Sequence, residues 1–147
     1  MLLGIDARMT PDLLSCLARM GHGDEIALVD SNYPAASTAA HCVIREPIQL
    51  TGLDAAEAAR LITSVMPLDP FVPHCALRME VDGQPDEVTD VHRAVFDIIE
   101  ERMPEGAGTA SIERQDYYAH ARTCFAVVQC SEARAFGCFI LRKGVVF

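Results

Sequence analysis

The stretch that decides the fold is residues 10–30, TPDLLSCLARMGHGDEIALVD. Thr10 can cap a helix, Pro11 suits its first position, and apolar residues follow at helical spacing. We expect Gly21 to end this helix in the left-handed conformation. The apolar run at 26–29 predicts a short buried strand. The stretch therefore predicts a helix, a tight Gly-His-Gly turn and a strand with a polar loop at each end.

The rest of the chain continues this alternation of helices and strands. We expect further strands at residues 42–45, 76–81, 111–114, 125–128 and 137–141, and further helices at residues 54–65, 88–103 and 116–122. Asp54 and Asp116 can cap two of these helices. The 147 residues suit one domain, and the sequence shows no repeat and no linker. Residues 1–147 are therefore expected to form a single α/β domain, a central β-sheet with helices packed on it.

Composition and charge narrow the classes of partner. Half of the residues are hydrophobic, which is enough for a sizeable core. Twenty-one acidic residues face 12 basic ones, and the formal net charge of −9 argues against binding to nucleic-acid phosphates or to an anionic membrane. The sequence has no apolar run of the roughly 20 residues that a membrane span needs, and its start lacks the pattern of a signal peptide. We therefore expect a cytoplasmic protein with neither a nucleic-acid nor a membrane partner.

The six cysteines have several interpretations. Their even number would allow three disulfides, but most of them stand in apolar runs and no export signal precedes them. His120 and Cys124 are four residues apart, yet no group of His and Cys has the spacing of a zinc site. A thiol-dependent enzyme would need one cysteine of depressed pKa in a cleft. We favour free, buried thiols that pack as small hydrophobic side chains, with no bound metal.

Two polar residues stand at opposite ends of the strand predicted at 26–29. Glycines on both sides leave the His22 imidazole uncrowded, and histidine can both donate and accept a proton near neutral pH. Asp30 follows the strand, where the ligands of α/β proteins gather. The alternatives are a solvent-exposed loop histidine without a role and an aspartate that only forms an Asx turn.

Arg114 and the adjacent tyrosines Tyr117 and Tyr118 are the third group of candidates. Arginine supplies a rigid fork of donors, and tyrosine supplies a hydroxyl and an apolar face, so that both suit a polyhydroxylated ligand. The alternative is a surface arginine beside half-buried tyrosines. The sequence contains no nucleophile elbow, phosphate-binding loop or dinucleotide fingerprint.

The features of residues 10–26 occur in the order of a known protein family. The block Met20-Gly-His-Gly-Asp-Glu25 is the most specific part, and Asp30 and Tyr33-Pro-Ala35 continue it. Weaker matches follow in the right order at Ile44-Arg45, Leu68-Asp69, Ile112-Glu-Arg114, Tyr118, 125–128 and 140–145. Over nearly its whole length the chain resembles the RbsD/FucU family of sugar mutarotases, and the L-fucose branch more than the ribose branch.

This resemblance implies a fold, an assembly and a reaction. Members have RbsD-like α/β subunits that assemble into rings, often decamers of two stacked pentamers, with sites near the subunit boundaries. They interconvert the α and β anomers of a reducing sugar without a metal or an organic cofactor. By position, His22 matches the catalytic histidine of the family. Asp30 and Arg114 match residues that contact the sugar, and Tyr118 is assigned with them to the substrate site.

The chain departs from the family pattern just before its last strand. The family usually has Tyr-x-Asn there, and both side chains help to hold the sugar, whereas this chain has Phe136-Gly137-Cys138. Phe136 and Cys138 are still expected to line the substrate site. A phenyl ring and a thiol then replace a hydroxyl and an amide, so that two strong hydrogen-bonding groups are lost.

We therefore predict a monosaccharide mutarotase for L-fucose or a related sugar, with His22 as the general acid and base of ring opening and closing. The expected assembly is a homo-oligomer, the decamer of the family, and no cofactor is expected. The departure at Phe136 and Cys138 motivates the alternative of a non-catalytic sugar-binding or regulatory protein on the same scaffold.

Overall fold

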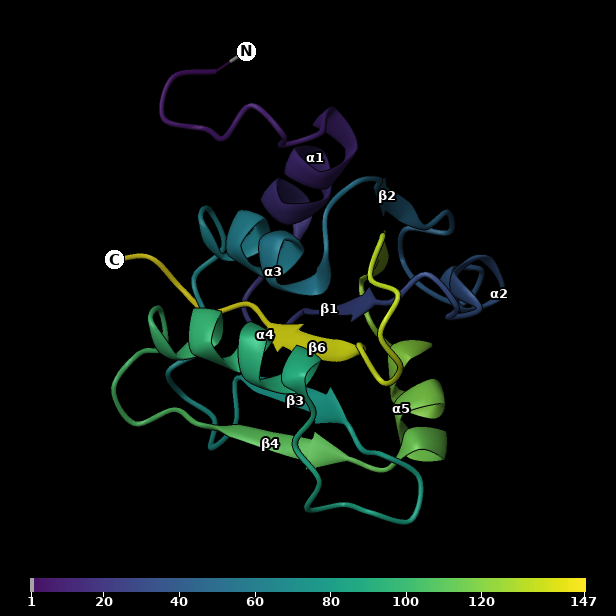
Figure 1. Cartoon of the computed structure of the whole chain (residues 1–147). Coiled ribbons are helices and arrows are strands. Elements are labelled where there is room, and N and C mark those ends of the chain that lie inside the picture. Colours follow the sequence, from purple (N-terminus) through teal and green to yellow (C-terminus); the bar gives the residue numbers. More distant parts are fainter. Residues whose placement is uncertain (1) are drawn as a thin grey trace.

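The computed structural model describes residues 2–147 and contains one six-stranded sheet with helices around it (Figure 1). The strands are β1 (Glu25–Val29), β2 (Ile48–Leu50), β3 (Ala76–Met79), β4 (Thr109–Ile112), β5 (Ala126–Cys130) and β6 (Phe139–Arg142). The helices are α1 (Pro11–Arg19), α2 (Ala35–Ala39), α3 (Ala55–Thr63), α4 (Asp90–Glu100) and α5 (Arg114–Ala121). The predicted fold class, α/β with helices packed on a central sheet, is confirmed.

The order of the strands across the sheet is β2-β5-β1-β6-β3-β4. β6 runs antiparallel to both of its neighbours, β1 and β3, and all other neighbouring pairs are parallel. At the centre of the sheet, Leu28 of β1 lies beside Val128 of β5 and Phe139 of β6. Because of this arrangement, the ends of β1 and β3 lie at the same edge of the sheet as the start of β6.

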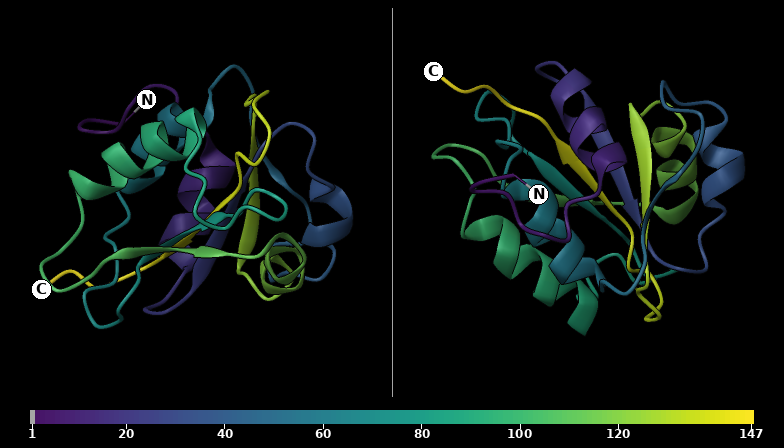
Figure 2. Two further views of the ribbon diagram at one scale, coloured as in Figure 1. Left: turned by 60° about the horizontal axis from the view of Figure 1, so that its bottom comes forward. Right: turned by 90° about the horizontal axis from the view of Figure 1, so that it is seen from above.

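Helices cover both faces of the sheet (Figure 2). α1, α3 and α4 pack on one face over the larger core cluster, and α2 and α5 pack on the other face. Side chains alternate between these clusters along β1, with Ile26 and Leu28 in the first and Ala27 and Val29 in the second. A strand buried on both faces is therefore continuously apolar, as the sequence indicated.

The first helix ends differently from the prediction. Thr10 caps α1 as expected, its side chain accepting the N–H of Leu13. Met20 forms the C-cap in an extended conformation (φ −65°, ψ 141°), so that the left-handed ending predicted at Gly21 is wrong. The left-handed residue is Gly23 (φ 86°), where an added Cβ would lie 3.1 Å from Nη2 of Arg142. Glycine is favoured there because L side chains rarely adopt a φ of 86°.

The strand predicted at 42–45 is wrong, and α2 just before it was not predicted. Cys42 Sγ donates to the carbonyl of Ala121 in α5 at 3.4 Å, and the N–H of Ile44 donates to the carbonyl of Phe125, just before β5, at 2.9 Å, a single backbone bond that does not make a strand. The edge strand β2 forms only after Pro47, whose missing N–H does not interrupt the ladder with β5. α2 has five residues, too few for a helical period to show in the sequence.

The helix predicted at 116–122 begins earlier. The Glu113 carboxylate accepts the backbone N–H groups of Gln115 and Asp116 at 2.6 and 3.1 Å, so that Glu113 caps α5 in place of Asp116. Arg114 consequently becomes the first residue of the helix, directly after β4. The other predicted elements are present as α3, β3, α4, β4, β5 and β6, with ends shifted by at most three residues.

All six cysteines are free and buried, as predicted. Burial raises the pKa of every one of these thiols, that of Cys16 and Cys130 to about 11. The thiols therefore stay protonated near neutral pH, which removes the basis for a thiol-dependent enzyme. Within residues 2–147, every helix is too short or too polar to cross a bilayer.

Candidate functional site

A small cavity lies at the edge of the sheet where β1 and β3 end and β6 begins. Its volume of about 180 Å³ is below the ~300–1,000 Å³ of pockets for drug-sized ligands, so that it suits a smaller molecule. Five residues predicted for substrate binding line it: Asp30, Arg114, Tyr118, Phe136 and Cys138. Asn32, Tyr33, Met79 and Ala135 complete the wall. Residues from four separate segments of the sequence thus meet at one place.

Asp30 is the negative group of the cavity. Its Oδ1 accepts the backbone N–H of Asn32 at 3.0 Å, which is the Asx turn of the alternative interpretation. Its Oδ2 accepts the thiol of Cys138 at a distance of 3.4 Å from Sγ. Burial and the adjacent Asp30 charge raise the pKa of Cys138, so that the thiol stays protonated and donates. Asp30 therefore shapes its loop and also presents a carboxylate to the cavity.

Arg114 is the positive group of the cavity. Its Nε donates to Oδ1 of Asp82 at 2.6 Å, and Asp82 lies on the turn that follows β3. The hydrogen bond and the charge of Asp82 raise the pKa of Arg114, which stays cationic. With 36% of its side chain exposed, Arg114 can direct the rest of its donor fork toward ligand oxygens.

The two adjacent tyrosines of α5 take different places. Tyr118 lines the cavity and stacks on Tyr33, with ring centroids 5.2 Å apart and an angle of 12° between the planes. Tyr117 is fully buried, and its hydroxyl donates to the carbonyl of Phe139 at 2.9 Å. Tyr117 therefore fastens α5 to β6 as a core residue, and Tyr118 alone remains a candidate for contact with a ligand.

The other lining residues Met79, Ala135 and Phe136 are apolar. Phe136 has φ 60° and is the one non-glycine residue of the left-handed region among residues 2–147. The lining of the cavity thus combines charged and hydroxyl groups with hydrocarbon. Such a lining suits a small polyhydroxylated ligand with an apolar face.

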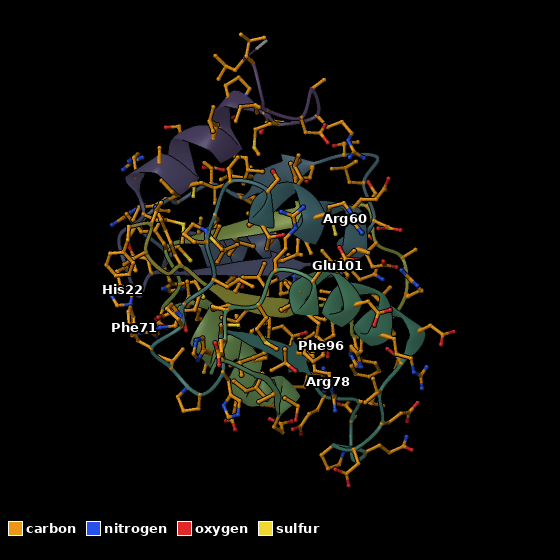
Figure 3. The ribbon with its side chains drawn as sticks, turned by 90° about the vertical axis from the view of Figure 1, so that its left-hand side faces the viewer. His22, Arg60, Phe71, Arg78, Phe96 and Glu101 are labelled. Atoms are coloured by element: carbon orange, nitrogen blue, oxygen red, sulfur yellow. The ribbon has the colours of Figure 1, made fainter. Side chains whose placement is uncertain are left out.

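His22 lies at the opposite edge of the sheet, in the turn that leads into β1, whereas Asp30 follows the end of β1. The five residues of β1, at about 3.3 Å each, separate these two edges by roughly 16 Å. The His22 side chain is 46% exposed, and the ring of Phe71 meets it edge-on with centroids 5.6 Å apart (Figure 3). Within one chain, His22 and the cavity therefore do not meet.

Asp69 holds the His22 ring from inside the protein. Its side chain is buried, and Oδ1 lies 3.1 Å from Nε2 of His22 and accepts the N–H of Phe71 at 2.9 Å. Its Oδ2 accepts Nε–H of Arg142 at 3.0 Å. Burial favours the neutral acid, but the hydrogen bonds from Phe71, Arg142 and His22 outweigh it and hold the pKa of Asp69 below its ordinary value. The ionised carboxylate of Asp69 can only accept, so that Nε2 of His22 donates to it and Nδ1 is the ring nitrogen left for a ligand.

Sequence reasoning did not select Asp69, Asp82 or Phe71 for the site. Asp69 is 47 residues from His22, and no local pattern links the two. The family match at Leu68-Asp69 was the one signal that could have pointed to it. Asp82 lies in the turn after β3, and its bond to Arg114 joins two segments that are 32 residues apart in the sequence.

A second polar cluster, Glu25, His120 and Cys124, lies beside the start of β1. Their potential ligand atoms are all within 4.8 Å of one another. His120 Nε2 is 2.6 Å from Oε2 of Glu25, and Arg142 Nη1 is 3.5 Å from Oε1. The carboxylate therefore already has two cationic partners, and the cluster is best described as an ion pair between β1 and α5.

This pair is expected to make stability depend on pH. The hydrogen bond that His120 donates to Glu25 raises the pKa of His120 above 6.5. Although burial opposes it, the same bond lowers the pKa of Glu25 below 4.5. The stabilisation is fully present between these ordinary values and is lost as the pH rises through the raised pKa of His120. Urea unfolding should show that Glu25→Gln lowers the free energy of unfolding by roughly 1 kcal/mol or less near pH 6. The loss should be smaller near pH 8, and an equal loss at both would contradict the pairing.

Comparison with known proteins agrees on one family. A sequence model of the RbsD/FucU transport protein family matches residues 3–146. The fucose mutarotase of Homo sapiens is 38% identical over 99% of this chain and 94% of that protein. The L-fucose mutarotase of Haemophilus influenzae is 32% identical over 99% of this chain and 97% of that protein.

A solved structure supports the same relationship. The fucose mutarotase of Streptococcus pneumoniae, crystallised in complex with L-fucose, has a TM-score of 0.85 to this chain at 32% sequence identity. The match covers 99% of this chain and 100% of that one. With this agreement of sequence and fold over the whole length, the chain belongs to the RbsD/FucU family.

Proposed function

We propose that this chain is a monosaccharide mutarotase that interconverts the α and β anomers of L-fucose or a related reducing sugar. The observation that carries the proposal is the cavity of about 180 Å³, whose lining combines the polar side chains of Asp30 and Arg114 with the apolar side chain of Phe136. A pyranose has the same two kinds of surface, because its hydroxyls point outward and its C–H groups form apolar faces. The relatives named fucose mutarotase, one of them bound to L-fucose, support the reaction and the sugar.

Ring opening needs a base for the anomeric hydroxyl and an acid for the ring oxygen. The base takes the hydroxyl proton, the bond between C1 and the ring oxygen breaks, and the ring oxygen gains a proton. The open aldehyde end rotates, and the reverse steps close the ring on its other face. Nδ1 of His22 can take up and return the proton, because an imidazole is suited to both roles near neutral pH. Asp30 and Arg114 would hold the sugar hydroxyls during rotation.

Because β1 separates His22 from the cavity of the same chain by roughly 16 Å, a site that uses both groups has to draw them from two subunits. In the proposed assembly, a neighbouring subunit brings its His22 to the mouth of the cavity. Phe71, which is 63% exposed and packs against His22, would be buried by that contact. Each site would then combine the cavity of one subunit with the His22-Asp69 pair of the next. For this homo-oligomer we propose the decamer that the resemblance to the family implies.

Two variants that are each inactive should restore activity when they share an oligomer. His22→Ala keeps the cavity, and Arg114→Ala keeps His22, so that a mixed oligomer contains some sites with both intact halves. After the two chains are unfolded together and refolded at equal amounts, about a quarter of the sites should be complete if assembly is random. Anomer exchange measured by saturation-transfer NMR should recover to that level.

Light scattering provides the control for this mixing experiment. Each variant and the mixture should have the same mass, far above the 16.0 kDa of one chain. A monomeric mass at micromolar concentration would contradict the shared site. Oligomers of normal mass that stay inactive after mixing would mean that His22 and Arg114 do not serve a common site across subunits.

The function itself is tested by anomer exchange of the wild-type protein on a panel of sugars. Saturation-transfer NMR detects the interconversion directly, and L-fucose should be among the accelerated sugars. If the protein binds a sugar without accelerating its exchange, the non-catalytic sugar-binding alternative takes the place of the mutarotase. The six protonated thiols suit a reducing compartment, so that a cytoplasmic location is part of the proposal.

A further inference from the structure

Phe136 holds an unfavourable backbone conformation in the wall of the cavity. Its φ of 60° is one that a bulky non-glycine residue rarely adopts. Strained residues persist only where their surroundings hold them in place. The group that holds the Phe136 backbone therefore also sets where the phenyl ring meets a bound sugar.

His92 is bonded directly to this backbone. It is fully buried in the first turn of α4, where Nδ1 accepts the backbone N–H of Thr89 at 3.1 Å. Its Nε2 lies 3.0 Å from the carbonyl oxygen of Phe136. Because a backbone N–H can only donate, Nδ1 is unprotonated, and the single ring proton sits on Nε2. Nε2 therefore donates to Phe136, and both ring nitrogens are used.

The surroundings keep the His92 ring neutral. Burial lowers the pKa of His92, and this effect is larger than the opposite effect of the hydrogen bond to the Phe136 carbonyl. The positive charge of Arg78 on β3 also lowers the pKa, and the negative charge of Glu87 raises it. The ring packs edge-on against Phe139, with centroids 6.0 Å apart and an angle of 86°. A neutral ring keeps Nδ1 as an acceptor, so that both hydrogen bonds are present at neutral pH.

The chain next to Phe136 has little freedom to move. At Gly137 an added Cβ would lie 2.8 Å from Cγ of Glu132, so that the backbone packs closely against that side chain. The carbonyl of Cys138 accepts the N–H of Met79 at 2.9 Å, which ties the segment to β3. The peptide group between Phe136 and Gly137 is held by His92, and this bond completes the anchoring of the segment.

We propose that His92 is a positioning residue for sugar binding, whose Nε2–H bond to the Phe136 carbonyl holds the apolar wall of the cavity in the shape that the sugar contacts. The proposal rests on the proposed function, because it takes the cavity to be the sugar site. His92 does not line the cavity and touches no reacting atom, so that it acts through Phe136. Its loss should weaken sugar binding and leave the proton transfer at His22 unchanged.

A matched pair of variants separates the two bonds of His92. In His92→Gln the amide nitrogen can reach the Phe136 carbonyl, whereas in His92→Asn the shorter side chain can only replace Nδ1 as the acceptor for Thr89. His92→Asn should raise both the dissociation constant and the KM for L-fucose about 5- to 10-fold, with kcat within about 2-fold, because one hydrogen bond is lost. His92→Gln should restore most of the binding.

The dissociation constant is measured by titration calorimetry and the kinetic constants by saturation-transfer NMR, on the intact oligomer. Thr89→Ala, which removes the cap hydroxyl and leaves the bond to Phe136, is the stability control. It should lower the unfolding temperature and leave the dissociation constant unchanged. Equal weakening of binding by the Asn and Gln variants, or a loss of kcat at unchanged KM, would overturn the proposal.

A Phe136→Gly background keeps the proposal testable where His92→Asn alone does not fold, because glycine adopts φ 60° without strain. Phe136→Gly should weaken binding, and adding His92→Asn should cause no further loss, since His92 acts through Phe136. A further loss of several-fold in the double variant would refute the proposal. Binding and anomer exchange are measured separately, so that the two proposals can fail independently. If the wild type binds L-fucose without accelerating its exchange, only the mutarotase function is refuted. The role of His92 is then tested by the dissociation constants of its variants.

Discussion

Replacing His22 by alanine is expected to lower the anomer exchange rate by about 10²- to 10⁴-fold, the usual contribution of a general acid–base group. In the proposed assembly, the exposed imidazole, with Nε2 bonded to Asp69, is the group that presents Nδ1 to a neighbouring subunit. Its removal leaves the cavity intact, so that sugar affinity should change little. Saturation-transfer NMR at saturating L-fucose measures the rate, and calorimetric titration measures the affinity.

The exposed loop residue His41 provides the matched control for this substitution. His41→Ala removes the same chemical group from another loop and should leave the exchange rate unchanged. Both variants should keep the oligomeric mass of the wild type. An exchange rate of His22→Ala equal to that of the wild type, on every sugar that the wild type accelerates, would show that the proposed mechanism is wrong.

Asp69→Asn is expected to have the second-largest effect, a loss of about 10²-fold in exchange rate. The amide cannot serve all three donors that the carboxylate accepts, which are the N–H of Phe71, Nε2 of His22 and Nε of Arg142. If the amide nitrogen faces Arg142, the N–H groups of the amide and the Nε–H of Arg142 are both donors and cannot bond to each other. If it faces His22, the ring must accept at Nε2, so that Nδ1 carries the proton and the base is lost.

Glu25→Gln is the control for this variant, because Glu25 is the other carboxylate bound by Arg142. It perturbs the same guanidinium and leaves the contact between Asp69 and His22 in place, so that the exchange rate should stay near that of the wild type. Thermal unfolding checks that the Asp69→Asn oligomer is folded. A folded Asp69→Asn protein with wild-type exchange would mean that His22 acts without a buried carboxylate partner.

Several parts of the fold could be predicted because they depend on local patterns. The cap at Thr10, the helical spacing in α1 and the apolar run of β1 are each contained within a few residues. The edge where the cavity lies followed from the rule that ligands gather where strands end, which selected Asp30. The five residues predicted for substrate binding line one cavity, and their roles in sugar binding stay predictions.

Other features could not be predicted because they depend on contacts between distant segments. His22 and Asp30 lie at opposite ends of β1, as the predicted strand implied, but no local pattern showed which distant side chains surround them. The bond between Asp69 and His22 depends on a loop that returns to the start of β1. The segment 42–45 has the composition of a strand, but its contacts are a thiol bond to α5 and one backbone bond to Phe125.

The placement of His22 at one edge of the sheet and of the cavity at the other has a consequence for stoichiometry. If His22 of each subunit meets the cavity of the next, the subunits associate head to tail. An open row of such subunits always has one cavity without a histidine at one end and one histidine without a cavity at the other. Closing the row into a ring removes both ends, so that the number of complete sites equals the number of chains. For this protein, closure of the assembly would therefore itself add catalytic capacity, and the yield of activity per chain should report whether the rings are closed.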